Sequence, residues 1–445
     1  MTLRQECKAW TLISVGALAI AGIFALLLVL SRTPGVQDIL PWPWKSFFHK
    51  GLVTHVVFSF VVWFLATMGA IMCLSYAKQV GIDQESQWGK GAVGLAMLGC
   101  LGLIIPALFD LGTAELNNYI PVMNHPIYYG GLVLLLAGLV LVTLRQFTLS
   151  WQKTNQLSGT QTTGIIYLIA VLCMGLAFFY MPEGLPDPTF NEQLFWGGGH
   201  VLQFVNTALL FLAWMVIVKT ATGLELMPRK YVYVVFGLLV IFCLPAPAIY
   251  FLFDILSQTH RDFYTEMLRY GLPLPSIIVS AFLLIFLLSR ASRELDKISR
   301  LALWLSLFTY NLGGLYGLML DGTDTRVPAH YHAVIGGINL AFMVFYHRVI
   351  LPFISVQVRE GKLFTAQYWL YGLGQIMHAS GMFLAGSQGV PRKTAGDAQS
   401  LDNIEKILSM GLMGIGGLIA VIGGVLFVIM TMKWIIKGGK IYETT

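Results

Sequence analysis

The chain has 445 residues, of which 56% are hydrophobic and 11% are charged, and its formal net charge is +6. This composition excludes an ordinary soluble domain, in which about 25% of residues are charged. Apolar runs long enough to cross a bilayer recur along the whole length, without the alternating ten-residue segments of a membrane β-barrel. The sequence therefore predicts an all-α polytopic membrane protein.

The predicted membrane spans follow one another without a soluble domain between them. The first, residues 11–31, follows Arg4 and Lys8 and lacks the small-residue cleavage pattern of a signal peptide, so we interpret it as a retained span. We expect a single twelve-span membrane domain over residues 1–445. The other eleven spans are predicted at residues 51–76, 91–113, 126–144, 162–182, 194–218, 231–254, 274–290, 301–320, 330–353, 363–386 and 408–432.

The connections between the spans divide into two sides of opposite charge. Lys and Arg gather on the side that holds both termini, as in residues 227–231 and 289–300, whereas Asp and Glu are in excess on the other side. The positive-inside rule therefore places both termini in the cytoplasm. The outer connections are longer and rich in Pro and aromatic residues, which suits either a lid or an interfacial aromatic belt. They are residues 31–50, 180–196, 257–275 and 389–406.

The cysteines predict no covalent framework. No CxxC or CxxCH motif occurs, which argues against a disulfide scaffold, a zinc knuckle and a covalently attached c-type haem. We expect buried small hydrophobic residues at the five positions, Cys7, Cys73, Cys100, Cys173 and Cys243.

The nine histidines fall into two groups. Histidine inside a membrane span is costly and indicates function by default. Four are interpreted as structural or surface residues: His49 and His125 at or near span ends, His260 in an outer loop, and His347, which lies beside Arg348 and can snorkel. Five lie within spans, the first four of them at a similar depth below the outer surface: His55, His200, His330, His332 and His378.

The pair in "VPAHYHAVIGG", residues 327–337, has an informative spacing. Residues two apart on a helix are separated by about 200°, so His330 and His332 project on nearly opposite faces. One metal ion cannot take both, because helical zinc sites prefer an i, i+4 spacing. Two flat cofactors, one on each side of the helix, fit this geometry, and imidazole is a common axial ligand of haem iron.

These features resemble the catalytic subunit of the haem–copper oxidase superfamily, which includes cytochrome c oxidases, quinol oxidases and nitric oxide reductases. The resemblance rests on twelve spans, a histidine in the second, "FWGGGH" opening the sixth and H-x-H opening the tenth. It implies that His55 and His332 are the axial pair of a low-spin haem and that His330 is the proximal ligand of a high-spin haem. It also implies that His200 is a ligand of a second metal, copper or non-haem iron.

The resemblance further implies a respiratory-chain oxidoreductase of the terminal oxidase or nitric oxide reductase type. Electrons would pass from the low-spin haem to the high-spin haem, which binds and reduces oxygen or nitric oxide. Both haems are expected to be b-type. The expected partners are a c-type cytochrome or a copper-containing donor subunit, other membrane subunits and the lipid bilayer, with no nucleic acid. A bacterial or archaeal cytoplasmic membrane is the expected location.

The sequence departs from the family at the second metal. The family supplies an adjacent His-His pair on the seventh helix, but this chain has no His-His, and residues 245–247, Pro-Ala-Pro, stand at about that place. Two prolines should also bend the helix. Such sites normally use three or more ligands, so copper or iron there is doubtful. A looped-back set of His200, Asp254 and His260 is one alternative.

Other polar residues leave further alternatives open. Residues 201–206 lack the glutamate of nitric oxide reductases, and no Lys, Asp or Glu lies in mid-membrane. Arg326, with Asp321 and Asp324 nearby, is a candidate partner for haem propionates. A non-catalytic di-haem subunit is the second hypothesis, and a proton-coupled transporter without haem is the third. A polar thread within the spans could relay protons or bond its neighbours: Tyr310, Asn311, Tyr316, Asn339, Gln375 and His378.

Overall fold

The computed structural model describes residues 1–32, 44–150, 154–320, 324–392, 394 and 399–439. The described residues are helical almost throughout, with one two-stranded hairpin. They group into two compact units: unit 1 is Met1–Leu212 with Met227–Val279, and unit 2 is Ala213–Leu226 with Ser280–Thr445. The expectation of one domain over residues 1–445 stays a prediction.

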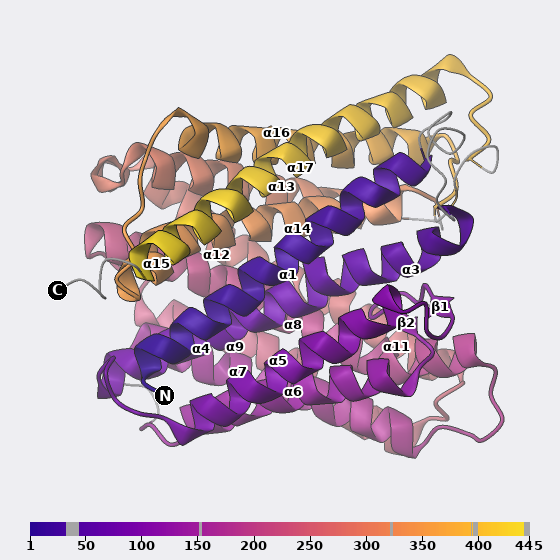
Figure 1. The fold of residues 1–445 in the computed structure, drawn as a ribbon, viewed down its shortest axis with the longest axis horizontal. Coiled ribbons are helices and arrows are strands. Elements are labelled where there is room, and N and C mark those ends of the chain that lie inside the picture. The colour runs from indigo at the N-terminus through magenta and orange to yellow at the C-terminus, as the bar shows by residue number, and fades with distance from the viewer. Residues whose placement is uncertain (33–43, 151–153, 321–323, 393, 395–398, 440–445) are drawn as a thin grey trace. The chain divides into compact units, whose positions relative to one another are not determined.

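Unit 1 contains the helices from α1 to α11 and the first part of α12. Figure 1 shows its first helix, α1, beside α3 and α4. Its elements, with α8 and α12 continuing into unit 2, are α1 (Leu3–Arg32), α3 (Trp44–Val56), the π-helix η1 (Val57–Val62), α4 (Trp63–Val80), α5 (Gln87–Leu108), β1 (Ala114–Glu115), β2 (Val122–Met123), α6 (Pro126–Gln146), α7 (Asn155–Phe179), α8 (Asp187–Thr222), α9 (Arg229–Cys243), the 3-10 helix η2 (Ala246–Ala248), α10 (Ile249–Leu252), α11 (Gln258–Gly271) and α12 (Pro273–Leu288).

Local sequence signals fix several of these helix starts. Ser86 accepts a hydrogen bond from the Gly89 N–H at the start of α5, and Thr154 does the same for α7. Proline follows the N-cap His125 at the start of α6, where its missing N–H costs nothing. Between α5 and α6, the antiparallel strands β1 and β2 form a short hairpin.

A buried ion pair joins α1 to α6 within unit 1. Arg145 donates to both carboxylate oxygens of Glu6, at 2.6 and 2.8 Å, and also to the Ser86 hydroxyl at 2.9 Å. The two charged side chains are 1% and 0% exposed. The Arg145 guanidinium also lies over the Tyr76 ring, 4.7 Å from its centroid. Sequence reasoning missed this pair because its members stand 139 positions apart, outside the predicted cores of the spans.

The seventh predicted span is interrupted as its prolines predict. Helix α9 ends at Cys243, and the chain passes through η2 into the single turn of α10. The segment 257–275 differs from expectation, because the predicted outer loop is mostly the amphipathic helix α11. Its buried residues recur at helical spacing: His260, Tyr264, Met267 and Gly271.

Unit 2 contains the helices that follow. Figure 1 shows α16 and α17 running side by side, and α14 also packs on α13 and α16. Its elements, besides the ends of α8 and α12, are the 3-10 helix η3 (Arg290–Glu294), α13 (Lys297–Leu318), α14 (Arg326–Phe345), the π-helix η4 (Tyr346–Ile350), α15 (Leu351–Phe353), α16 (Lys362–Ser387) and α17 (Ile404–Gly439).

Asp296 organises the start of α13. Its carboxylate accepts hydrogen bonds from the backbone of Ile298 and Ser299, and it forms an ion pair with Arg348 at 2.7 Å. Burial would raise the pKa of Asp296, but hydrogen bonds from Ser299 and Arg348 outweigh burial and hold the pKa below its usual value. The carboxylate thus stays charged as an N-cap.

The helices match the predicted spans closely. Ten helices of the described residues are long and apolar enough to cross a membrane. Helices α13 and α16, of 22 and 26 residues, occupy the other two predicted positions. The prediction of an all-α membrane bundle is therefore confirmed, and its count of twelve agrees with these helices.

The expectations for the cysteines and for two histidines can be compared with the structure. Four of the five cysteines are buried and Cys100 is half-buried, with none in a disulfide, as expected of small hydrophobic residues. The expectation that His347 snorkels is wrong, because its side chain is fully buried. His260 is also fully buried, on α11, where a surface or loop position was expected.

Candidate cofactor site

His330 lies near the start of α14, in a niche made by α13. Its Nδ1 is 2.7 Å from the Gly313 carbonyl oxygen. A carbonyl can only accept, so Nδ1 carries the proton and Nε2 keeps its lone pair. Gly317 leaves room for the ring, since a Cβ there would lie 2.7 Å from the imidazole. The ring is therefore fixed with its metal-binding nitrogen unprotonated.

His332 contacts a different helix from His330. Its ring meets the His378 ring of α16 edge to face, with centroids 4.9 Å apart and planes at 82°. His378 in turn donates from Nδ1 to the Met413 carbonyl of α17 at 2.8 Å, which leaves its Nε2 unprotonated. The two histidines of H-x-H thus face α13 and α16 separately, as the 200° separation predicts.

His55 in unit 1 is held in the same manner. It lies one residue before the end of α3, where the π-helix η1 begins. Its Nδ1 is 2.9 Å from the Ala21 carbonyl of α1, so Nε2 again keeps the lone pair. Of the histidines predicted to bind haem, His55 and His330 are thus each held by a backbone carbonyl, and His378 beside His332 is held in the same way. The sequence does not reveal these carbonyls, because they belong to neighbouring helices.

His200 on α8 differs from these three, because both of its ring nitrogens are engaged. Nδ1 donates to the Trp196 carbonyl at 2.6 Å, and Nε2 is 2.8 Å from the Tyr119 hydroxyl. Tyr119 comes from the loop of the β1–β2 hairpin and packs against Gly199, where a Cβ would lie 2.5 Å from its ring. The Nε2 lone pair of His200 thus accepts from tyrosine.

The region after the Pro245–Pro247 break brings aromatic side chains to His200. The Tyr264 ring lies 5.9 Å from the His200 ring and 5.2 Å from the His260 ring. His260 is fully buried, and neither of its nitrogens has a hydrogen-bond partner. The Asp254 carboxylate accepts from the Leu256 N–H at 2.8 Å. Among the described residues, no three His, Cys, Asp or Glu side chains are grouped to hold a metal ion.

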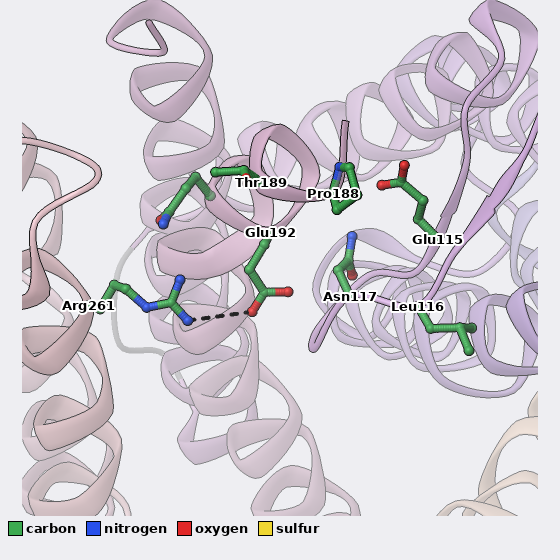
Figure 2. Close-up of a pocket in the computed structure, with 8 residues that line it drawn as sticks. Glu115, Leu116, Asn117, Pro188, Thr189, Glu192 and Arg261 are labelled. Carbon is green, nitrogen blue, oxygen red and sulfur yellow. Dashed lines mark ion pairs between the residues drawn. The ribbon is translucent and has the colours of Figure 1, made fainter. Parts of the chain in front are cut away.

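A polar pocket of about 420 Å³ lies in unit 1 beside the residues around His200. Figure 2 shows Arg261 pointing toward Glu192 across it, at 3.9 Å. The Arg261 guanidinium also lies over the Trp196 ring, 4.2 Å from its centroid, and Trp196 packs on His200. Sequence reasoning missed this pocket, which the hairpin loop, α8 and α11 form together.

Arg326, the expected propionate partner, is engaged with Asp324 in unit 2. Its guanidinium donates to both carboxylate oxygens, at 2.6 to 3.1 Å, and its backbone N–H donates at 2.8 Å. The hydrogen bond from Arg326 holds the pKa of Asp324 below its usual value. The pair stands one turn before His330. Asp321, the third residue expected here, lies outside the described residues.

Two proteins and one solved structure are similar to this chain over most of its length. An uncharacterised protein of Rickettsia prowazekii (strain Madrid E) is 27% identical, covering 98% of each chain. An uncharacterised protein of Aquifex aeolicus (strain VF5) is 33% identical, covering 75% of this chain and 83% of its own length. A cryo-EM structure of a heme-copper terminal oxidase dimer matches this chain with a TM-score of 0.75 at 17% sequence identity. The match covers 97% of this chain and 84% of the chain in that structure.

The family-level match covers almost the whole sequence. The sequence model of the family described as "Cytochrome C and Quinol oxidase polypeptide I" matches residues 7–435. That range includes both units and every histidine discussed above. The structural match independently supports the same fold. The chain is therefore an integral membrane protein that belongs to the cytochrome c and quinol oxidase polypeptide I family.

Proposed function

We propose that the protein is a haem-binding oxidoreductase subunit of a respiratory chain that reduces a small gas molecule, oxygen or nitric oxide. One observation carries the proposal. His55 and His330 each donate Nδ1–H to a backbone carbonyl, at 2.9 and 2.7 Å, and so keep Nε2 unprotonated. This is how proteins prepare imidazole for a metal, because the second hydrogen bond fixes the tautomer and raises ligand basicity.

The residues fit two haems, which the family generally binds, and we expect both to be b-type. His55 and His332 would be the ligands of a low-spin haem, and His330 would be the ligand of a second, high-spin haem. When bound, the haems supply one-electron chemistry and a site for a gas ligand. The chain itself orients the imidazoles. Arg326, one turn before His330 and held by Asp324, would order the propionate end by charge pairing.

Electrons would come from a partner, because the sequence has no CxxCH motif for its own c-type haem. A c-type cytochrome or a copper-containing subunit on the outer side suits this role. We expect further membrane subunits and a bacterial or archaeal cytoplasmic membrane with both termini inside. The charge asymmetry of the connections supports that orientation.

The residues around His200 do not fit a second metal ion. The His200 Nε2 is hydrogen-bonded to Tyr119, and the described residues supply no group of three His, Cys, Asp or Glu ligands. The set of His200, Asp254 and His260 would require Tyr119 to release His200. This favours a second candidate function, a di-haem electron-transfer or gas-binding subunit that lacks the second metal.

Haem and metal analysis of the purified protein tests both functions. We expect two haems per chain by the pyridine haemochrome assay. Two haems with stoichiometric copper or iron beyond haem would support gas reduction at a two-metal centre. Two haems and no other metal would support the di-haem subunit. A protein without haem would overturn both functions.

A further inference from the structure

The connection between α12 and α13 in unit 2 carries an unbalanced positive charge. Residues 289–300 contain four cationic side chains and two carboxylates. The Asp296 carboxylate is already engaged, because it caps α13 and pairs with Arg348 at 2.7 Å. Glu294 is thus the one acid left to balance four cations. These cations form none of the ion pairs of the described residues, and they are Arg290, Arg293, Lys297 and Arg300.

The 3-10 helix η3 fixes the side to which two of these cations belong. A 3-10 helix has three residues per turn, so residues three apart lie one above the other. Ser292 and Leu295 are both buried and form the inward side. The Ser292 hydroxyl donates to the Leu287 carbonyl at 2.9 Å, which holds η3 against the end of α12. Arg290 and Arg293 share another side, and both are exposed. We call this pair the arginine face.

The arginine face directly follows an apolar, exposed end of α12. Leu284, Ile285 and Leu288 lie on one side of the last turns of this helix, and all three are exposed. The helix ends a segment, Gln258–Leu288, that is long and apolar enough to cross a membrane, so these side chains contact acyl chains. Arg290 stands two residues after Leu288. A lipid whose chains rest on this side of α12 therefore brings its phosphate to the level of the arginine face.

We propose that the arginine face and the exposed end of α12 bind an anionic phospholipid of the membrane leaflet on the predicted cytoplasmic side. Two neighbouring guanidinium groups suit a phosphodiester, because arginine forms paired, charge-assisted hydrogen bonds with phosphate oxygens. Phosphatidylglycerol offers this phosphate with a net negative charge, whereas the choline group of phosphatidylcholine cancels the charge. Lys297 and Arg300, at the start of α13, add attraction for the same headgroup at longer range.

A second basic connection on the same predicted side differs from the arginine face. In residues 227–231, Arg229 donates to the Tyr233 hydroxyl at 2.6 Å, and Lys230 lies 5.0 Å from the centroid of the Tyr231 ring. These two cations are thus engaged by aromatic side chains of α9. A general attraction of basic loops to an anionic membrane would use both connections alike. A defined lipid site would depend on the arginine face far more than on residues 227–231.

Native mass spectrometry of the purified full-length protein tests the site, because it counts the lipids bound to each molecule. Phosphatidylglycerol is titrated in detergent, with phosphatidylcholine in a parallel series. We expect Arg290→Gln/Arg293→Gln to weaken phosphatidylglycerol binding roughly tenfold and to leave phosphatidylcholine binding unchanged. The matched control, Arg229→Gln/Lys230→Gln, removes the same charge from the same predicted side and should weaken binding less than about twofold. Equal binding by the two double variants would overturn the site.

Two further measurements separate a lipid from a free phosphate ion and from a folding defect. Ile285→Ala/Leu288→Ala keeps the arginine face but removes apolar surface, so we expect it to weaken phosphatidylglycerol binding severalfold. Unchanged binding would show that phosphate alone is recognised and would overturn the lipid site. The melting temperature of Arg290→Gln/Arg293→Gln in lipid-free detergent should equal that of the wild-type protein, because both guanidinium groups are exposed. A lowered melting temperature would assign the two arginines to the fold instead.

Discussion

Replacing His330 with alanine is expected to abolish carbon monoxide binding to the reduced protein while sparing the low-spin haem spectrum. His332→Ala is expected to do the reverse, with carbon monoxide still bound and the low-spin signal lost. The reason is geometric. His330 is seated against Gly313 and Gly317 of α13, whereas His332 faces His378 of α16, so each variant removes an imidazole from one side of α14.

Reduced and carbon-monoxide difference spectra of the two variants provide the measurement. His49→Ala is a suitable control, because His49 is exposed and stands six residues before His55 on α3. It should leave both spectra unchanged. If His330→Ala and His332→Ala gave the same spectrum as the wild-type protein, the assignment of both histidines would be wrong.

Breaking the buried Glu6–Arg145 pair is expected to be the most destabilising substitution in unit 1. Arg145→Leu leaves the Glu6 carboxylate buried without its charge partner. Glu6→Gln likewise leaves the Arg145 guanidinium buried without its charge partner. Removing one partner of a buried pair costs roughly 3–5 kcal/mol. The double variant Glu6→Leu/Arg145→Leu should recover much of the loss, because no unpaired charge remains.

Thermal denaturation in detergent at one fixed scan rate measures this effect. The exposed pair Arg4–Asp83, with side chains 38% and 78% exposed, is the matched control. Asp83→Asn should change the free energy of unfolding by less than about 1 kcal/mol. A midpoint for Arg145→Leu equal to that of Asp83→Asn would show that the buried pair does not hold α1 to α6.

The sequence predicted the helices well because long apolar runs are a strong signal. Residues 330–353, for example, lie within α14, η4 and α15, which together cover Arg326–Phe353. The loop prediction for residues 257–275 failed because polar residues cover one face of α11. The buried His260, Tyr264 and Met267 nevertheless recur at helical spacing, so that signal was present in the sequence.

The site was only partly predictable. The H-x-H spacing indicated that His330 and His332 face different neighbours, and the contacts with α13 and α16 agree. The hydrogen bond between Tyr119 and His200 could not be foreseen, because it joins a hairpin loop to a helix 81 positions away. Backbone carbonyl acceptors, such as that of Gly313, leave no trace in the sequence at all.

Near-infrared magnetic circular dichroism of the oxidised protein tests most directly the claim that this chain holds a bis-histidine haem, because the technique identifies both axial ligands of low-spin iron. We expect one bis-imidazole haem per chain, with that signal lost in His55→Ala and in His332→Ala. A low-spin haem with a different axial pair, or a bis-imidazole signal that survives His55→Ala, would contradict the assignment of His55 and His332.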